Sequence, residues 1–298
     1  MADRVRDPGP GRMAAQPGVT GPAVARLLGR EVVSTTSLGG ATRVDLADGS
    51  SVVAKSGPTV AAEAAGLRWL ADAGGPAVAH LDAADRDWLV TRYVPTTAPT
   101  PEAAEAFGVA LSRMHAAGAP EFGSPPPDGP VDAWIGTAPM RNVESDDWAS
   151  WYAAYRVLPF ARTARDAGTF DADDVELVEQ VCARLPELAG PAEPPARLHG
   201  DLWSGNVLWT ADGALLIDPA AHGGHRETDL AMLELFGLPH LSRVRAAYDE
   251  AAPLAPGHAA RIPLHQLFPL LVHVVLFGGG YVGRALAAAR AALRAPRH

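Results

Sequence analysis

The spacing of apolar and polar residues over the first hundred positions predicts a small sheet that carries one helix. Residues 31–37 (EVVSTTS) are rich in β-branched residues, and Asp48-Gly49 separates two extended runs, as in a hairpin. Residues 59–73 show the three-to-four-residue apolar spacing of a helix. The predicted order is β-β-β-α-β-β, and its remaining elements are a short helix at 21–30 and strands at Ala77–Leu81 and Trp88–Val94.

Beyond a linker at 95–101 (PTTAPTP) the pattern becomes mainly helical. The exception is 196–219, which reads as loop, strand, turn and strand. We therefore predict an α+β fold of two lobes, a β-rich N-lobe with one helix at 21–95 and a larger, helical C-lobe at 96–298, after a disordered leader at 1–20. Helices are expected at 101–117, 145–167, 171–189, 226–236, 239–252 and 259–294.

Charge and composition narrow the classes of function. The 298 residues carry a formal net charge of −9, which does not supply the basic surface that nucleic-acid binding needs. A single cysteine, Cys182, excludes an internal disulfide and fits a reducing compartment. We expect no nucleic-acid partner.

The sequence near the two ends of the chain does not predict a membrane-spanning segment. The apolar stretch from Phe268 to Val282 is shorter than the roughly 20 residues of a spanning helix and is interrupted by glycines. The N-terminus lacks the apolar core of a secretory signal, and Met13 is an alternative start. We expect a cytoplasmic protein, without membrane contact, that is a monomer.

One motif indicates a chemical function more clearly than the rest of the sequence. It is His199-Gly-Asp201-Leu-Trp-Ser-Gly-Asn206, followed by Asp218 at the end of a later apolar run. Phosphoryl transfer needs a carboxylate that orients the attacking hydroxyl, and an amide and a second carboxylate that bind magnesium. Kinase catalytic loops use this spacing. The alternative is a polar turn, because these residue types also favour turns.

Lys55 is the only lysine among 25 basic residues. It ends the run SVVAK, as a phosphate-binding lysine ends a strand in kinases, and Glu63 lies eight residues later on the expected helix, where it could pair with the lysine. A surface lysine and a solvated glutamate are the alternative. Gly39 and Gly40 join two strands, where they could let backbone N–H groups approach phosphates or simply form a turn.

The sequence resembles the fructosamine-3-kinase (ketosamine-3-kinase) family, which has the fold of aminoglycoside phosphotransferases and protein kinases. The resemblance rests on VVAK, DAWIG, LHGDLWSGNVLW, LIDPA and GHRETDLAMLELFG. It implies ATP and Mg²⁺ as cofactors and a small-molecule or protein-attached ketosamine as substrate. By motif, Asp201 would be the base, Asn206 and Asp218 the metal ligands, Lys55 the phosphate contact with Glu63 as partner, and Arg92, Tyr93 and Val94 would face adenine.

Other residues have two interpretations each. Asp229 is either a buried carboxylate that accepts hydrogen bonds from the catalytic-loop backbone or an acid favoured by a helix N-terminus. Trp203, His225 and His273 are candidates for substrate contact, and Trp203 and His273 could equally be core residues. A hydrolase-like metal site of His222, His225 and Asp201 is a weaker alternative.

The function expected from these observations is ATP-dependent phosphorylation of a sugar hydroxyl on a ketosamine. An aminoglycoside, choline or homoserine kinase of the same fold is one alternative. A nucleotide-binding pseudokinase that acts as a scaffold is another, although the complete Lys55, Asp201, Asn206 and Asp218 set counts against it.

Overall fold

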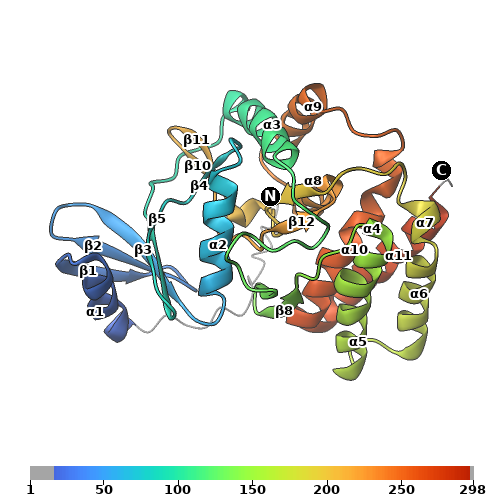
Figure 1. Cartoon of the computed structure of the whole chain (residues 1–298), viewed down its shortest axis with the longest axis horizontal. Coiled ribbons are helices and arrows are strands. Elements are labelled where there is room, and N and C mark those ends of the chain that lie inside the picture. The colour runs from blue at the N-terminus through green and yellow to red at the C-terminus, as the bar shows by residue number, and fades with distance from the viewer. Residues whose placement is uncertain (1–16, 296–298) are drawn as a thin grey trace, which may run out of the picture.

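The computed structural model describes residues 17–295 and consists of two lobes side by side (Figure 1). The smaller N-lobe is built on a five-stranded antiparallel sheet of order β1-β2-β3-β6-β5. Helix α1 covers the sheet beside β1, and α2 packs against β5 and β6. The N-lobe elements are α1 (Pro17–Leu28), β1 (Val32–Ser37), β2 (Thr42–Leu46), β3 (Ser51–Ser56), α2 (Val60–Ala71), β4 (Ala77–Val78), β5 (Leu81–Ala84) and β6 (Trp88–Arg92).

The C-lobe is mainly helical, and its long α10 packs against α5, α8 and α11. Its helices are α3 (Pro101–Ala116), α4 (Trp148–Trp151), a π-helical segment (Tyr152–Val157), α5 (Leu158–Asp166), α6 (Ala172–Ala183), α7 (Leu185–Leu188), α8 (Arg226–Phe236), α9 (Leu241–Ala251), α10 (His258–Phe277), the 3₁₀ turn η3 (Gly278–Tyr281) and α11 (Val282–Arg294). Its short strands are β7 (Asp132–Ile135), β8 (Ala138–Arg141), β9 (Ala196–Leu198), β10 (Val207–Thr210), β11 (Gly213–Leu216) and β12 (His222–Gly224).

Strand β4 joins the two lobes. The predicted strand Ala77–Leu81 divides, because β4 pairs in parallel with β11 of the C-lobe, while β5 starts at Leu81 and joins the N-lobe sheet. Helix α2 also lies close to the C-lobe at Gly66, where a Cβ atom would be 3.2 Å from both Pro219 and Ala221. The predicted division near residue 95 therefore misses one connection, since β4 belongs to a C-lobe sheet.

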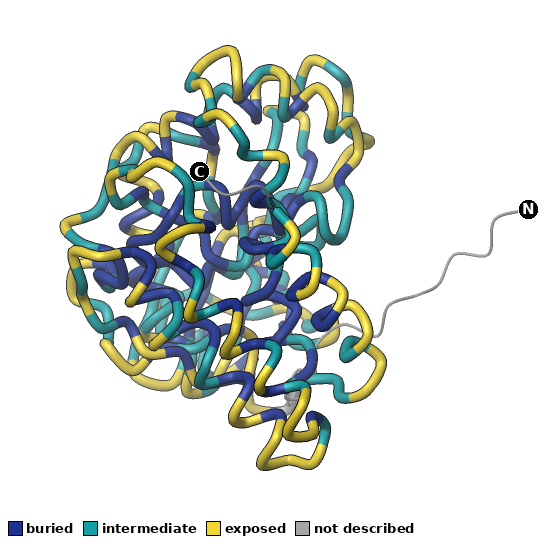
Figure 2. The backbone as a smooth tube through the Cα atoms, turned by 90° about the vertical axis from the view of Figure 1, so that its right-hand side faces the viewer, coloured by how far each residue is buried: buried dark blue, intermediate teal, exposed yellow. Residues whose placement is uncertain are grey.

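Buried apolar residues form separate cores, and Figure 2 shows the buried segments running through the interior of the larger lobe. The N-lobe core lies between α1 and the sheet and contains Val24, Val44 and Val90, each fully buried. The main C-lobe core contains Leu267 and Leu271 of α10. A third core, around Phe107 and Trp209, supports β10 and β11, the two strands that follow the loop at 199–206.

The expected leader at 1–20 is too long. Residues 17–20 already belong to α1, because Thr20 is 1% exposed and the helix packs on β1. Residues 1–16, including the alternative start Met13, lie outside the described residues.

Two long predicted helices are interrupted. The 145–167 segment begins with an isolated bridge at Ser145 and contains a π-helical turn between α4 and α5. The 259–294 segment breaks at Gly278, whose φ of 75° lies in the region that glycine adopts without strain.

The helical run His258–Arg294 is longer and more apolar than the sequence reasoning allowed. It spans 37 residues and contains an 18-residue window with a mean hydropathy of 1.5, which is sufficient by length and composition to cross a membrane. In this structure its apolar residues Leu264, Phe268 and Leu271 pack into the C-lobe core instead. The expected absence of membrane contact stays a prediction.

Candidate active site

The segment His199–Asn206 forms a loop that follows β9 and ends in the 3₁₀ turn Ser204–Asn206, directly before β10. The Asp229 carboxylate fixes its start, accepting the backbone N–H of His199 at 2.8 Å and that of Gly200 at 3.0 Å. Gly200 has a φ of 81°, and a Cβ atom there would overlap the Ala220 carbonyl. The structure thus confirms the first interpretation of Asp229, a buried carboxylate that holds the loop backbone.

Asp229 is itself held from behind by a buried histidine. His115 Nε2 lies 3.2 Å from Asp229 Oδ2, and His115 Nδ1 lies 2.8 Å from the Tyr248 hydroxyl. Burial alone would raise the pKa of Asp229, but the hydrogen bond and charge of His115 outweigh it and lower the pKa. The loop is therefore anchored on an ionised carboxylate inside the C-lobe.

Asp201 and Asn206 meet within the loop. The Asn206 Nδ2 donates to the Asp201 backbone oxygen at 2.8 Å and to Asp201 Oδ2 at 2.9 Å. Burial raises the pKa of Asp201 to about 7, against the opposing effect of the Asn206 hydrogen bond. Because Nδ2 already donates two hydrogen bonds to Asp201, Oδ1 is the Asn206 atom left to bind a cation.

Lys55 of β3 joins the two lobes electrostatically. Its Nζ lies 2.8 Å from Glu63 Oε1 on α2 and forms a second, shorter ion pair with Asp218. Burial disfavours the charged ammonium, but the two carboxylates outweigh this effect and raise the pKa of Lys55. Asp218 has a φ of 56°, in the left-handed region that Asp tolerates better than most residues. The predicted Lys55–Glu63 pair is present.

These groups line one cavity of about 320 Å³ between the lobes, which we call the cleft. Lys55, Glu63, Asp201, Asn206 and Asp218 all contribute to its wall, as do Gly40 and Trp203. The sequence reasoning had placed all seven at the functional site, and the fold brings them together from five separate segments.

The cleft also contains residues that the sequence reasoning missed. Trp134, Gly136 and Thr137 come from the β7–β8 hairpin, which was not predicted. A signal was available in the sequence, because the apolar residues Ala133, Ile135, Ala138 and Met140 alternate on either side of Gly136-Thr137. The structure buries all four.

Trp203 is held over the catalytic loop by a glycine. A Cβ atom on Gly205 would overlap three carbons of the Trp203 ring, so the ring occupies space that only glycine leaves open. Trp203 is partly exposed, lines the cleft and meets Phe236 edge-on at 6.1 Å between ring centroids. Of its two interpretations, the structure favours the one that exposes the ring to an acceptor.

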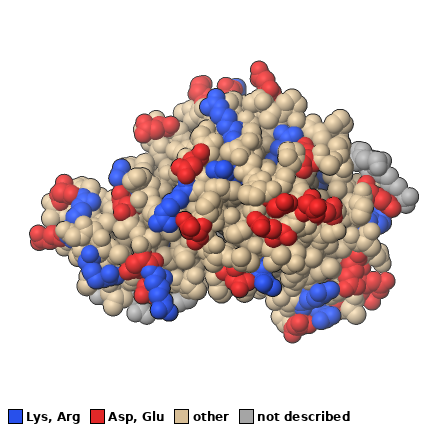
Figure 3. Space-filling view, in the orientation of Figure 1, with Lys and Arg blue, Asp and Glu red and all other residues tan. Residues whose placement is uncertain are grey.

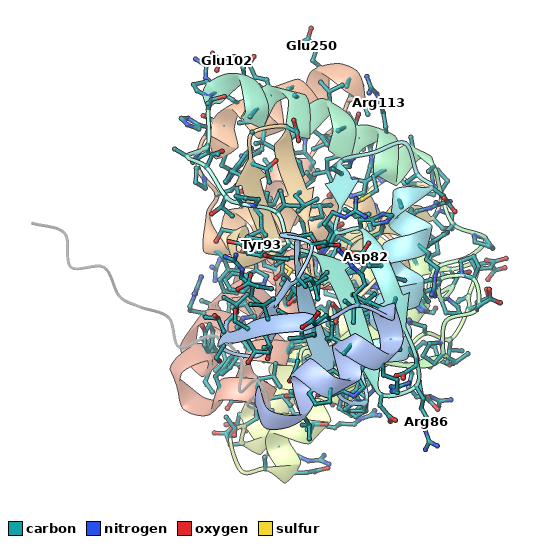
Figure 4. The ribbon with its side chains drawn as sticks, turned by 90° about the vertical axis from the view of Figure 1, so that its left-hand side faces the viewer. Asp82, Arg86, Tyr93, Glu102, Arg113 and Glu250 are labelled. Carbon is teal, nitrogen blue, oxygen red and sulfur yellow. The ribbon has the colours of Figure 1, made fainter. Side chains whose placement is uncertain are left out.

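The residues expected at the adenine lie at the edge of the N-lobe rather than among the residues that line the cleft. Arg92 forms an ion pair with Asp82 of β5 at 2.9 Å, and the Arg43 guanidinium lies 4.4 Å from the centre of the Tyr93 ring. Asp82 and Tyr93 are labelled in Figure 4. Val94 is half-buried beyond the end of β6. Gly39 precedes the lining residue Gly40. Nucleotide contact by these four residues stays a prediction.

Two substrate candidates lie elsewhere. His225 is 4% exposed, precedes α8 and packs against the rings of Trp148 and His265, so its burial gives no support to the expected contact with substrate. His273 does not line the cleft directly and packs against Phe236, with 4.7 Å between the ring centroids.

The weaker metal hypothesis is also not supported. Among the described residues, the group whose ligand atoms lie within 4.8 Å of one another is His225, Glu227 and His265, without His222 or Asp201. The Arg261 guanidinium already binds both carboxylate oxygens of Glu227. A positive charge therefore occupies the position where a cation would be needed.

The surface gives no sign of a concentrated basic patch on the face drawn in Figure 3, where acidic and basic side chains are interspersed. This agrees with the net charge of −9. The expected absence of a nucleic-acid partner stays a prediction.

Comparison with known proteins assigns the chain to one family. A family model described as fructosamine kinase matches residues 53–295. A probable ketoamine kinase from Vibrio parahaemolyticus is 34% identical over 203 residues, which cover 66% of this chain and 66% of its own length. Mouse ketosamine-3-kinase is 37% identical over 153 residues, 51% of this chain and 48% of its own length.

A solved structure gives the same result for the fold. A Thermobifida fusca protein assigned as a fructosamine-3-kinase is 51% identical, with a TM-score of 0.86, and covers 92% of this chain and 98% of its own. The predicted two-lobe, kinase-like α+β fold and the family resemblance are both confirmed.

Proposed function

The chain belongs to the fructosamine kinase family, and from that premise we propose that it transfers the γ-phosphoryl group of ATP to a sugar hydroxyl of a ketosamine. The observation that carries the proposal is the convergence of Lys55, Asp201, Asn206 and Asp218 on one cleft. An amide, two carboxylates and an ammonium there are the set that phosphoryl transfer requires.

Asp201 is the proposed base. A carboxylate whose pKa is about 7 is well matched to accept a proton from a hydroxyl near neutral pH. Its backbone is fixed through Asp229, and its side chain is held by Asn206. The acceptor hydroxyl is thereby oriented as well as deprotonated, and positioning is a major part of the rate gain.

Lys55 is the proposed contact to the nucleotide phosphates. Glu63 holds its ammonium from one side, in the manner of the lysine–glutamate pair of kinases. Asp218 holds it from the other side, at the place where phosphates would lie. Nucleotide binding therefore replaces part of the Lys55–Asp218 ion pair.

The donor set of Asn206 and Asp218 fits magnesium. An amide Oδ1 and a carboxylate are hard oxygen ligands, and both side chains line the cleft. Held by these two residues, Mg²⁺ would supply positive charge to the nucleotide phosphates. Asp218 then has two tasks, since it also binds Lys55.

Trp203 is the proposed contact to the sugar. Its ring lies next to Asp201 along the chain and lines the same cleft, and aromatic faces pack against the apolar faces of sugar rings. The Trp134 side chain, from the β7–β8 hairpin, lines the cleft too.

A panel of acceptors tests the proposal by release of ADP. We expect fructosyl-, ribulosyl- or erythrulosyl-amines to be phosphorylated with higher kcat/KM than kanamycin, choline or homoserine, and EDTA to abolish the reaction. Preference for one of the last three acceptors would overturn the ketosamine assignment while leaving a kinase. ATP binding without turnover of any acceptor would support the pseudokinase scaffold instead.

The other small-molecule kinases of this fold have less support, because the family match is to fructosamine kinase. The identity of the sugar and the amine is open to the panel. A cytoplasmic location and a monomeric state stay predictions.

A further inference from the structure

Four aromatic side chains form a continuous row that starts in the cleft. Trp203 meets Phe236, the last residue of α8, at 6.1 Å between ring centroids; Phe236 meets His273 of α10 at 4.7 Å; and His273 meets Tyr281 of η3 at 4.9 Å. We call these residues the aromatic row. They come from four separate elements that the fold brings together.

The aromatic row is partly exposed rather than part of the core. All four side chains have intermediate exposure, whereas most of the neighbouring residues of α10 are buried. Beside Tyr281, Cβ atoms built on Gly279 and Gly280 would meet nothing within 4 Å. The row is therefore accessible in part along its length, and the backbone beside Tyr281 leaves room next to its outer end.

A positive charge, that of the exposed Arg284 side chain, lies beside the row. The Arg284 guanidinium carbon is 5.9 Å from the ring centres of both Phe236 and Tyr281, and Arg284 Nη2 donates to the Leu235 carbonyl at 3.0 Å. A second cation placed on these rings would be repelled by Arg284. The row thus suits an uncharged apolar group.

We propose that the aromatic row is a subsite for the amine-derived part of the ketosamine, selective for an apolar or aromatic group without a second positive charge. The inference rests on the proposed function. A ketosamine has a sugar that must reach Asp201 and an amine-derived part that extends away from it. Trp203 borders both the reacting end of the cleft and the row, so it connects the two parts of the acceptor.

Three fructosyl adducts with the same reacting sugar test the subsite. They derive from methylamine, benzylamine and benzylamine that carries a para-aminomethyl group. For the unmodified protein we expect kcat/KM to be about tenfold higher for the benzylamine adduct than for the methylamine adduct, the worth of one or two aromatic contacts. The adduct with the additional ammonium group should lose most of that gain.

Two substitutions of Phe236 distinguish the loss of its aromatic ring from a general disturbance of the fold. Phe236→Ala and Phe236→Leu should both reduce the benzylamine-to-methylamine ratio toward one, and the leucine variant keeps most of the volume. Arg284→Gln should raise kcat/KM for the adduct with the additional ammonium group relative to the benzylamine adduct. Val33→Ala, at a 67% exposed position on the N-lobe, is the matched control and should leave both ratios unchanged.

The outcomes are distinct. A ratio near one in the unmodified protein, or a ratio that both Phe236 variants leave unchanged, overturns the subsite while the kinase assignment stands. Phosphorylation of none of the three adducts, together with turnover of kanamycin, choline or homoserine, overturns the proposed function and the subsite with it.

Discussion

The Asn206 Nδ2 lies 2.9 Å from Asp201 Oδ2, so the side chain proposed to bind metal also holds the proposed base. The two residues are five positions apart, and the short 3₁₀ turn at Ser204–Asn206 brings them face to face. The contact therefore couples the charge state of the Asp201 carboxylate to the position of the Asn206 amide.

Asp201→Asn should fold normally and lose on the order of 10²–10⁴ in kcat, the usual contribution of a positioned base. The amide keeps the shape of the side chain but cannot accept the hydroxyl proton. Single-turnover ADP release measures the loss, and a thermal melt checks the fold. Asp212→Asn, in the exposed β10–β11 turn, is the control, and undiminished turnover of Asp201→Asn would remove Asp201 from the role of base.

Lys55→Arg should lower kcat/KM by roughly 10- to 100-fold, about the worth of a hydrogen bond to a charged group. The planar guanidinium does not fit a position where one ammonium binds both Glu63 and Asp218. The matched control is Arg68→Lys, the reverse exchange at an exposed position of α2. If the arginine variant turns over at the normal rate, the ammonium is not required at the phosphates.

Gly205→Ala should displace the Trp203 ring, because the new methyl group would overlap it. We expect kcat/KM to fall about tenfold through the lost aromatic contact, and the tryptophan fluorescence to change. Gly283→Ala, on α11 with nothing within 4 Å, should instead stabilise the protein by up to about 1 kcal/mol. Unchanged kcat/KM in Gly205→Ala would show that the ring position does not matter for the acceptor.

The free energy of unfolding should fall as the pH falls below about 6.5, the ordinary pKa of histidine. Burial, followed by the charge of Arg156, lowers the pKa of His222 to about 3, and burial also lowers the pKa of His225. Between these values the unfolded chain binds protons that the folded chain does not. Each such histidine therefore costs up to about 1.4 kcal/mol per pH unit.

Urea unfolding at several pH values between 4 and 7 measures this slope. His222→Asn should reduce the number of protons taken up on unfolding by one, and the slope falls accordingly. The asparagine side chain can still donate to the Ala220 carbonyl, as the His222 ring does. His80→Asn, at a side chain that is 63% exposed, serves as the control and should leave the slope as it was. An unchanged slope in His222→Asn contradicts the assignment.

The parts of the site that could be predicted from sequence are those in which chemistry and spacing coincide. Asp201, Asn206 and Asp218 lie within 18 positions, and local turn and strand patterns place them correctly. Lys55 and Glu63 were found because a strand and a helix follow each other directly along the chain. The family, the kinase reaction and the two-lobe fold expected from these motifs are borne out.

What sequence reasoning missed depends on contacts between distant segments. His225 belongs to a motif, but its side chain turns into the core because Trp148 and His265, both far away in sequence, pack around it. No local pattern shows that β4 leaves the N-lobe sheet, since its partner is β11. The aromatic row likewise combines residues from four elements, and spacing along the chain cannot show that they meet.

The attachment of β4 to β11 has a consequence for how the carboxylates around Lys55 are held. Helix α2 packs against β5 and β6 of the N-lobe sheet, and at Gly66 it lies against Pro219 and Ala221 of the C-lobe. The strand that follows α2 along the chain, β4, pairs with β11 of the C-lobe. Glu63 on α2 and Asp218, next to Pro219, therefore reach the ammonium from two segments that are braced against each other, so the fold itself sets the spacing of the two carboxylates.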